Sequence, residues 1–148
     1  MQYKVRVGTV AEAIKVERQI PEFDRQRTEL DYQAKLKGRK FLVLIAEAEG
    51  QLLGYKVGYE ISATEFYSWL GGVVPEYRGF KVASTMRKHQ ENWASEQGFH
   101  SIRVNTFNKF RSMLQMLISS GYNICDFEQH KDLNQCKIAF IKKLRVLA

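Results

Sequence analysis

Apolar side chains recur along this chain with two different spacings, every second residue in some segments and every third or fourth residue in others. Residues 3–7 alternate between apolar and basic side chains, which predicts a first strand. Thr9 and Glu12 have the spacing of a capping box, so we expect a helix over residues 10–18. A second helix is expected over residues 28–36, just before a glycine that can end it.

The middle of the chain predicts three strands and a helix. Residues 41–47 form a strongly apolar run, a Glu-Gly turn follows, and residues 51–61 return as the paired strand. Residues 65–74 predict the third strand, and residues 80–97 then have helical spacing. The apolar face expected for this helix consists of Val82, Ala83, Met86, His89 and Trp93.

The remaining chain predicts a strand at 100–106, a helix at 108–120, and two closing strands at 122–127 and 136–143. The helix is expected to turn four apolar side chains inward: Phe110, Leu114, Leu117 and Ile118. The order of elements is therefore β-α-α-β-β-β-α-β-α-β-β. It predicts an α+β domain whose mixed, mostly antiparallel central sheet is flanked by about four helices, with a parallel pair of strands connected by the helix at 80–97.

The composition indicates one globular domain. The chain has 148 residues, of which 45% are hydrophobic, so we expect a single domain over residues 1–148. No apolar run reaches the roughly 18 residues of a membrane span, and the first residues lack the apolar segment of a secretory signal. Cys125 and Cys136 are expected to be reduced thiols, and the protein is expected to be cytoplasmic.

The chain is basic, with a net charge of +7. Such a surplus attracts nucleic acid, an acidic protein or a phosphorylated small molecule. The lysines and arginines are spread along the chain rather than gathered in one block, which argues against a nucleic-acid-binding surface. The three histidines have no metal-binding spacing, so no metal is expected.

A candidate anion site lies where the strand at 65–74 leads into the helix at 80–97. The first N–H groups of a helix have no partner within the helix and carry the positive end of its dipole. Arg78 and Lys81 add charge there, and Gly79 allows a ligand to approach the backbone closely. An ordinary basic helix start is the alternative interpretation.

The same stretch, VVPEYRGFKVA at residues 73–83, resembles the acetyl-CoA loop of the GNAT N-acyltransferases. That signature is Gln or Arg, any two residues, Gly, any residue, and Gly or Ala. Arg78 and Ala83 match its ends, while Lys81 replaces its glycine. Further similar stretches are IPEF at 20–23, YSWLGG at 67–72 and NTFNKFRSMLQMLISSGY at 105–122, so the resemblance covers roughly residues 3–146.

The resemblance implies that acetyl-CoA is the co-substrate and predicts which residues hold it. Main-chain N–H groups of the loop would bind its pyrophosphate, and the end of the preceding strand would hydrogen-bond the pantetheine amides as an added strand would. Asn108 matches an asparagine that contacts the cofactor arm in the family; from the residues alone it is equally a helix N-cap. The predicted cofactor-binding residues are Gly72, Val73, Val74, Arg78, Gly79, Phe80, Lys81, Val82, Ala83 and Asn108.

The catalytic residues are less sharply indicated. Transfer from a thioester to an amine requires a donor for the developing oxyanion, here the N–H of Gly72 or Val73, and a proton for the leaving thiolate. The family often supplies that proton from a tyrosine at the position of Leu117, so the usual acid is absent. The candidates for acid and base are the tyrosines Tyr67, Tyr122 and Tyr59 and the carboxylates Glu22, Glu65 and Glu60, with Tyr67 preferred as the acid.

The acceptor is expected to be a small-molecule or peptide amine. Aromatic residues of the strands and of the segment between the first two helices could line its pocket, although part of this group must be core. The predicted substrate-binding residues are Glu22, Phe23, Tyr59 and Trp69. A homodimer is compatible with the resemblance, and no membrane is expected as a partner.

Three functions remain open from the sequence. The first is an N-acetyltransferase that transfers acetyl directly in a ternary complex. The second is a catalytically inactive module that binds CoA or acyl-CoA, which Lys81 and Leu117 favour. The third is a basic nucleic-acid-binding domain, which rests on net charge alone.

Overall fold

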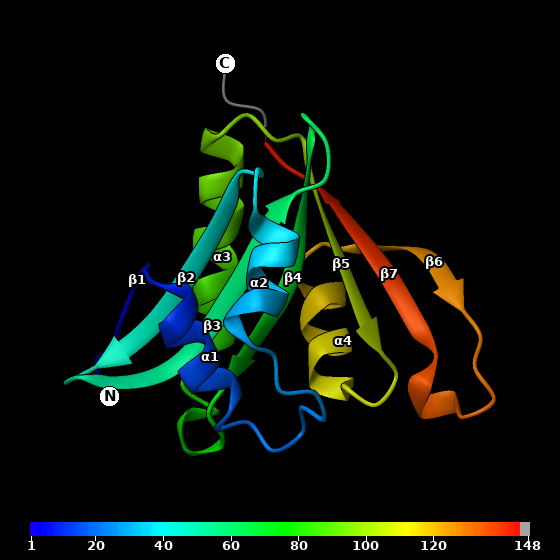
Figure 1. Cartoon of the computed structure of the whole chain (residues 1–148). Coiled ribbons are helices and arrows are strands. Elements are labelled where there is room, and N and C mark those ends of the chain that lie inside the picture. Colours follow the sequence, from blue (N-terminus) through cyan, green and yellow to red (C-terminus); the bar gives the residue numbers. More distant parts are fainter. Residues whose placement is uncertain (146–148) are drawn as a thin grey trace.

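A computed structural model describes residues 1–145, which form one seven-stranded sheet with helices on both faces (Figure 1). Residues 146–148, which belong to the predicted domain, lie outside the described residues. The strands are β1 (Lys4–Val7), β2 (Phe41–Ala48), β3 (Gln51–Glu60), β4 (Glu65–Val73), β5 (Ser101–Phe107), β6 (Asn123–Glu128) and β7 (Lys137–Lys143). The helices are α1 (Val10–Glu17), α2 (Glu29–Leu36), α3 (Val82–Glu96) and α4 (Arg111–Ser119). The predicted α+β class and element order are confirmed, and two short 3₁₀ turns, Pro75–Tyr77 and Leu133–Gln135, are added.

The sheet has the strand order β1-β2-β3-β4-β5-β7-β6. β4 and β5 are parallel, and α3 connects them as predicted. The remaining neighbours pair antiparallel. The one parallel junction therefore lies at the centre of the sheet, directly before and after α3.

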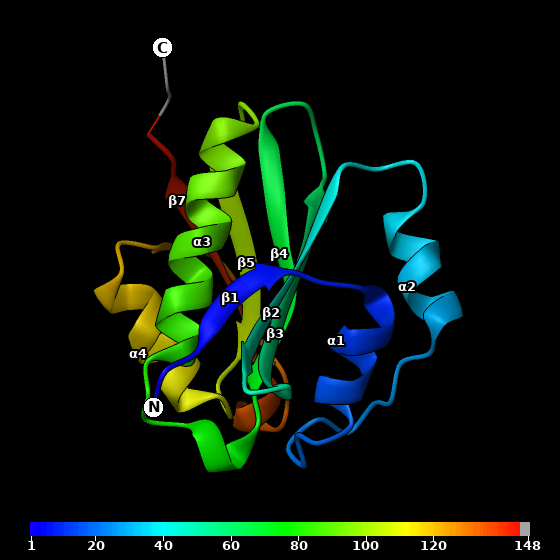
Figure 2. The same ribbon diagram turned by 90° about the vertical axis from the view of Figure 1, so that its left-hand side faces the viewer.

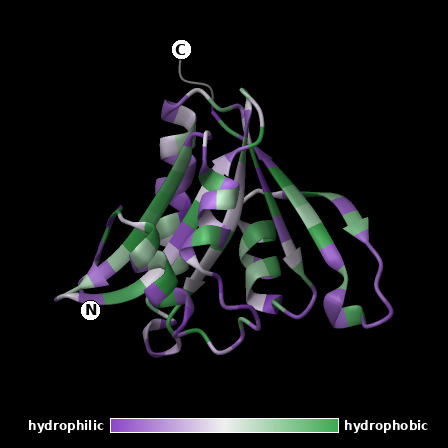
Figure 3. Cartoon of the chain, viewed as in Figure 1, coloured by the Kyte–Doolittle hydropathy of each residue, from purple (hydrophilic) through white to green (hydrophobic). Residues whose placement is uncertain are grey.

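The helices divide the core into two halves. Figure 2 shows α1 and α2 on one face of the sheet and α3 and α4 on the other. Tyr55 and Val57 of β3 pack on the face of α1 and α2, whereas Phe66 of β4 and Ile102 of β5 pack with Ala94 on the face of α3 and α4. The strands are accordingly the most hydrophobic segments, and the connecting loops are largely hydrophilic (Figure 3). Burial of these two apolar faces is the main force that holds the fold together.

Local sequence signals set the first two helices. The side chain of Thr9 accepts a hydrogen bond from the N–H of Glu12, whose carboxylate accepts one from the N–H of Thr9, so the predicted capping box is confirmed. Thr28 and Asp31 form a second capping box at the start of α2. Each cap fixes the residue at which its helix begins, so the second cap also fixes where the segment between α1 and α2 ends.

The starts of the other two helices were predicted too early. α3 begins at Val82 rather than at residue 80, because Lys81 adopts the left-handed conformation with φ of 62°. α4 begins at Arg111 rather than at Asn108. The residue before α4 is Phe110, and Asn108 instead donates a side-chain hydrogen bond of 2.9 Å to the carbonyl oxygen of Leu133, so it is no N-cap.

Two side chains that were expected to face inward do not. His89 of α3 is exposed, and Ile118 of α4 is 58% exposed. The buried face of α3 instead includes two polar residues, Arg87 and Gln90. Within residues 1–145, none of the helices is both long and apolar enough to cross a membrane.

Candidate functional site

The sheet opens between β4 and β5. The two strands pair only over Glu65–Ser68 and Ser101–Val104, whereas β5 remains paired with β7 as far as Phe107. Trp69 interrupts β4 as a bulge, because Ser68 pairs with Gly58 of β3 and the next paired residue is Leu70. Beyond the bulge β4 and β5 move apart (Figure 1). This edge of β4 can therefore pair with an extended ligand.

The direction of the N–H groups of β4 follows from one hydrogen bond. The N–H of Val74 donates to the carbonyl oxygen of Leu53 in β3. N–H groups alternate in direction along an antiparallel pair, so Gly72 also points to β3 while Val73 and Gly71 point to the open edge. Of the two oxyanion donors predicted from the sequence, Val73 thus has the suitable direction and Gly72 does not.

The start of α3 provides free N–H groups at the end of this open edge. Lys81, the N-cap, makes no side-chain capping bond. No acceptor among residues 1–145 takes the main-chain N–H groups from Gly79 through Ser84. The helix dipole adds positive potential at the same point. The turn is therefore suited to an anion such as a phosphate.

Two residues of this turn have positive φ. Gly79 has φ of 88°, and no atom lies within 4 Å of the place where a side chain would begin. Lys81 has φ of 62° and is exposed. Lys81 therefore adopts the conformation that a glycine favours and adds its charge at the surface of the turn.

The two glycines near the end of β4 make room for different neighbours. A Cβ atom on Gly72 would lie 2.6 Å from Cδ1 of Ile20 and 3.0 Å from the ring of Phe23, on the face of α1 and α2. A Cβ atom on Gly71 would lie 3.6 Å from Nζ of Lys56, on the face of α3. The absence of side chains on β4 therefore lets groups from both faces approach the open edge.

The segment between α1 and α2 reaches across this region. We call residues 22–24 the strap. Glu22 pairs with Arg78 at 2.6 Å, and Asp24 pairs with Lys109 at 3.2 Å. The ring of Phe23 lies 6.3 Å from that of Phe110, edge to face. The structure thus brings predicted acceptor residues next to the predicted pyrophosphate turn.

An aromatic cluster lies on the face of α1 and α2. The ring of Tyr59 lies 5.5 Å from that of Tyr67 and 5.7 Å from that of Trp69. Two guanidinium groups stack on the cluster, Arg27 over Trp69 and Arg39 over Tyr59. Tyr59 is itself buried in the core of this face, with Tyr67 and Trp69 packed against it, so the predicted acceptor role of these residues stays a prediction.

The predicted acids lie in different surroundings. Tyr67 accepts a hydrogen bond of 3.2 Å from Asn105 of β5, and burial raises the pKa of its hydroxyl. Tyr122 lies on the opposite face of the sheet and donates a hydrogen bond of 2.9 Å to Glu91. Burial and the neighbouring Glu91 carboxylate raise the pKa of Tyr122. Tyr67 and Tyr122 are therefore not brought together, and the catalytic roles of both stay predictions.

The predicted bases are all engaged. Glu65 accepts a hydrogen bond of 2.8 Å from Arg103, and Glu60 accepts one of 2.8 Å from the N–H of Lys40. Glu22 is held by Arg78 as described above. Of these three carboxylates, Glu22 is the one that contacts the turn before α3, and the catalytic roles of all three stay predictions.

Sequence reasoning missed a buried polar group beneath α3. Lys56 of β3 is 9% exposed, and burial lowers the pKa of its ammonium group to about 8. Arg87 and Gln90 of α3 are buried on the same face. The available signal was that Lys56 is the one charged residue in the otherwise apolar run of residues 52–59.

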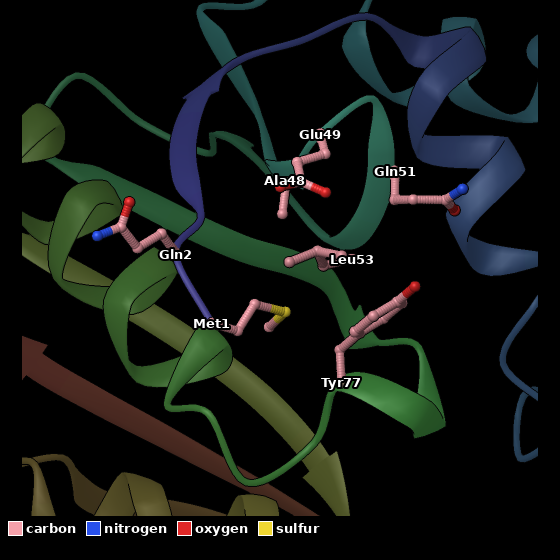
Figure 4. A pocket seen from close by; sticks show the side chains of 7 residues that line it. All are labelled: Met1, Gln2, Ala48, Glu49, Gln51, Leu53 and Tyr77. Carbon is pink, nitrogen blue, oxygen red and sulfur yellow. The ribbon is translucent and has the colours of Figure 1, made fainter.

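Other features do not form a site. A hollow of about 390 Å³ lies between the N-terminal residues, the turn that connects β2 and β3, and Tyr77, and Glu49 is its one charged side chain (Figure 4). Its lining consists of Met1, Gln2, Ala48, Glu49, Gln51, Leu53 and Tyr77. Within the described part of the chain, no three His, Cys, Asp or Glu side chains gather as a metal site would require.

Comparisons with known proteins agree with this geometry. The family model described as "Acetyltransferase (GNAT) family" matches residues 10–117. No curated protein sequence matches the chain.

Several solved structures have the same fold. The ribosomal-protein-S18-alanine N-acetyltransferase from Escherichia coli has a TM-score of 0.84 at 12% identity, over 99% of this chain and 96% of its own. Ard1 from Thermoplasma volcanium has a TM-score of 0.80 at 18% identity, over all of both chains. A GNAT family acetyltransferase from Elizabethkingia anophelis, solved with acetyl-CoA bound, has a TM-score of 0.74 at 12% identity, over 96% of this chain and 98% of its own.

Proposed function

Because this chain belongs to the acetyltransferase (GNAT) family, we propose that it transfers an acetyl group from acetyl-CoA to a primary amine. The transfer is direct, within a complex that holds both substrates, and no covalent enzyme intermediate forms. The observation that carries the proposal is the opening of β4 from β5 directly before the free N–H groups of the turn at 79–84.

The donor binds along this opening. The N–H groups from Gly79 through Ser84, with Arg78 and Lys81, hold the pyrophosphate. The pantetheine amides pair with the open edge of β4 at Gly71 and Val73. Running from the turn along β4 toward the point where β4 and β5 converge, the arm places its thioester just beyond the amide paired at Gly71, before the bulge at Trp69.

The acceptor amine approaches from the face of α1 and α2. Tyr59, Tyr67 and Trp69 form the aromatic wall there, and the strap forms the side nearest the donor. N–H groups on the open edge stabilise the oxyanion that forms when the amine attacks the thioester carbonyl. Glu22, once released from Arg78, is the carboxylate placed to accept the proton of the amine, directly or through water.

The experiment is an amine-dependent release of thiol from acetyl-CoA. The panel should contain small primary amines, polyamines, amino acids and peptides, including peptides that begin with alanine, because the name of the E. coli neighbour includes an alanine of a ribosomal protein. An enzyme releases thiol in proportion to one class of amine, with the acetylated product detected by mass spectrometry. If acetyl-CoA binds but no amine promotes release, the chain is a binding module rather than a transferase.

A further inference from the structure

Lys56 lies across the bare backbone of β4. Its backbone pairs with that of Gly71 in the ladder between β3 and β4, and its side chain lies on the face covered by α3. A Cβ atom on Gly71 would lie 3.6 Å from both Cγ and Nζ of Lys56, so the lysine folds over the glycine toward the opening. Any side chain at position 71 would compete with Lys56 for this space.

The neighbours of Lys56 leave its ammonium group without a partner. Glu91 of α3 is the nearest carboxylate, and three other donors already use it: Arg87 at 2.8 Å, Tyr122 at 2.9 Å and Lys142 at 3.0 Å. Within residues 1–145, Nζ of Lys56 makes neither a hydrogen bond nor an ion pair. The fixed charges around it are thus one carboxylate and two further cations.

The helix on this face of the sheet, α3, also has a buried side chain without a partner. Gln90 of α3 is 1% exposed, and neither its amide nitrogen nor its amide oxygen has a partner among the described residues. Nε of Arg87 is buried and unpartnered in the same way. Buried polar atoms without partners cost free energy, and they are rare unless a ligand or water meets them. The face of α3 that covers the sheet therefore has polar atoms free to meet a water or a ligand.

The reactive end of the donor reaches this space. Gly71 directs its N–H to the open edge, one residue after Leu70 and the bulge. In the proposed complex the arm enters from the turn at 79–84 and runs along β4 toward Ser68, so the thioester follows the amide that pairs with Gly71. Nζ of Lys56 lies 3.6 Å from the Cβ position of that glycine, which brings the ammonium group to the reactive end of the arm.

Resting on the function proposed above, we propose that Lys56 donates the proton to the departing sulfur of CoA. The amine nitrogen bonds to the carbonyl carbon, and the bond between that carbon and sulfur breaks. The electron pair stays with sulfur, which takes a proton from the ammonium group of Lys56 and leaves as the free thiol. The proton lost by the acceptor amine goes to the Glu22 carboxylate or to water, and Lys56 is protonated again from solvent.

The acidity of Lys56 suits this role. Burial lowers the pKa of its ammonium to about 8, with Glu91 opposing and Arg87 assisting the shift. That value is close to the pKa of about 8.5 for an ordinary thiol, so proton transfer between the two is nearly balanced. An exposed lysine would hold its proton too tightly to act as an efficient acid at neutral pH.

The test measures the ionisation of the thiol of bound CoA. The ultraviolet absorbance of the thiolate is recorded as the pH is varied. Desulfo-CoA bound to the same protein provides the baseline. With the wild type, the thiol should ionise at least one pH unit below free CoA, because a buried ammonium group favours the thiolate. Lys56→Met should abolish this shift. The control is Lys88→Met, which removes an exposed lysine of α3 and should leave the shift intact.

Lys56→Arg provides an independent check, because it keeps a cation but loses the transferable proton. It should retain the lowered thiol ionisation while slowing turnover at least tenfold. Unchanged thiol ionisation in Lys56→Met, with CoA still bound, would overturn the role of Lys56 alone. Failure of the folded wild type to bind CoA would overturn the proposed function together with it.

Discussion

Arg78 pairs with Glu22 at 2.6 Å, so the turn before α3 is tied to the strap between α1 and α2. Arg78 also donates a hydrogen bond of 3.2 Å to the carbonyl oxygen of Val73 on the open edge of β4. A single guanidinium group therefore links the three parts of the site. Because the same group is proposed to bind pyrophosphate, donor binding must compete with Glu22 for it.

This competition predicts that Glu22→Gln binds acetyl-CoA more tightly. The two side chains are about half exposed, 45% and 43%, and an ion pair of that kind contributes roughly 0.5–1 kcal/mol. Its loss should raise donor affinity about two- to fivefold, as measured by calorimetry. Glu29→Gln, the same change on α2, is the control and should leave affinity unaltered. Equal affinities for wild type and Glu22→Gln would show that the pair does not restrain Arg78.

The left-handed conformation of Lys81 predicts a stabilising substitution. Lys81→Gly removes the strain of φ at 62° and should raise the free energy of unfolding by about 0.5–1 kcal/mol, after the greater flexibility of glycine in the unfolded chain is subtracted. Lys88→Gly, in the interior of α3, should lower it by about 1 kcal/mol. Urea denaturation measures both, and a loss of stability in Lys81→Gly would contradict the assigned backbone conformation.

Glu17 is expected to be important for the stability of the α1–α2 face. Its side chain is almost fully buried and accepts hydrogen bonds from Tyr55 at 2.9 Å, Tyr32 at 3.2 Å and the N–H of Arg27 at 3.1 Å. Glu17→Gln removes the charge that these donors surround and should cost about 2–4 kcal/mol in unfolding free energy. Glu96→Gln, which is exposed, should change it by less than about 0.5 kcal/mol. Similar small losses in both variants would contradict this role.

Lys56 predicts a dependence of stability on pH. Its pKa is lowered to about 8 in the folded protein, whereas an unfolded lysine titrates near 10.5. Between these values the unfolded chain binds the extra proton, so this group makes stability rise with pH from about 8 to 10.5.

Lys56→Met should lack this rise and should be more stable than wild type at pH 7, by about 1–3 kcal/mol. Denaturant titrations at several pH values would measure the difference, with Lys88→Met as the control. A parallel pH dependence in wild type and Lys56→Met would contradict a buried, cationic Lys56. We therefore expect Lys56 to lower the stability of the folded protein while serving the proposed proton transfer.

The sequence predicted those elements whose signals are local. The capping box at Thr9 and the apolar spacing of the strands depend on residues within a few positions of each other, and they led to the correct element order. The start of α3 was missed because a lysine rarely adopts positive φ, so nothing in its type indicates the break at Lys81.

Contacts between residues far apart in the chain could not be predicted from the sequence. Asn108 is of a residue type that often caps helices, but its side chain donates a hydrogen bond to the carbonyl oxygen of Leu133, 25 residues away. The burial of Lys56 depends on Gly71 of the next strand and on α3 above both, so a charge in an apolar run gave only a hint. The turn proposed to bind the pyrophosphate, by contrast, is contiguous in sequence, so its residues could be named together before the structure; its binding role stays a prediction.

The most direct test of the donor site is calorimetric titration of acetyl-CoA into two charge-reversal variants of α3. Lys81→Glu places a carboxylate beside the free N–H groups of the turn, whereas Lys88→Glu makes the same change of charge on an exposed position further along the helix. We expect saturable binding by wild type and Lys88→Glu and at least tenfold weaker binding by Lys81→Glu. Equal binding by the two variants would place the donor elsewhere and contradict the assignment of this turn.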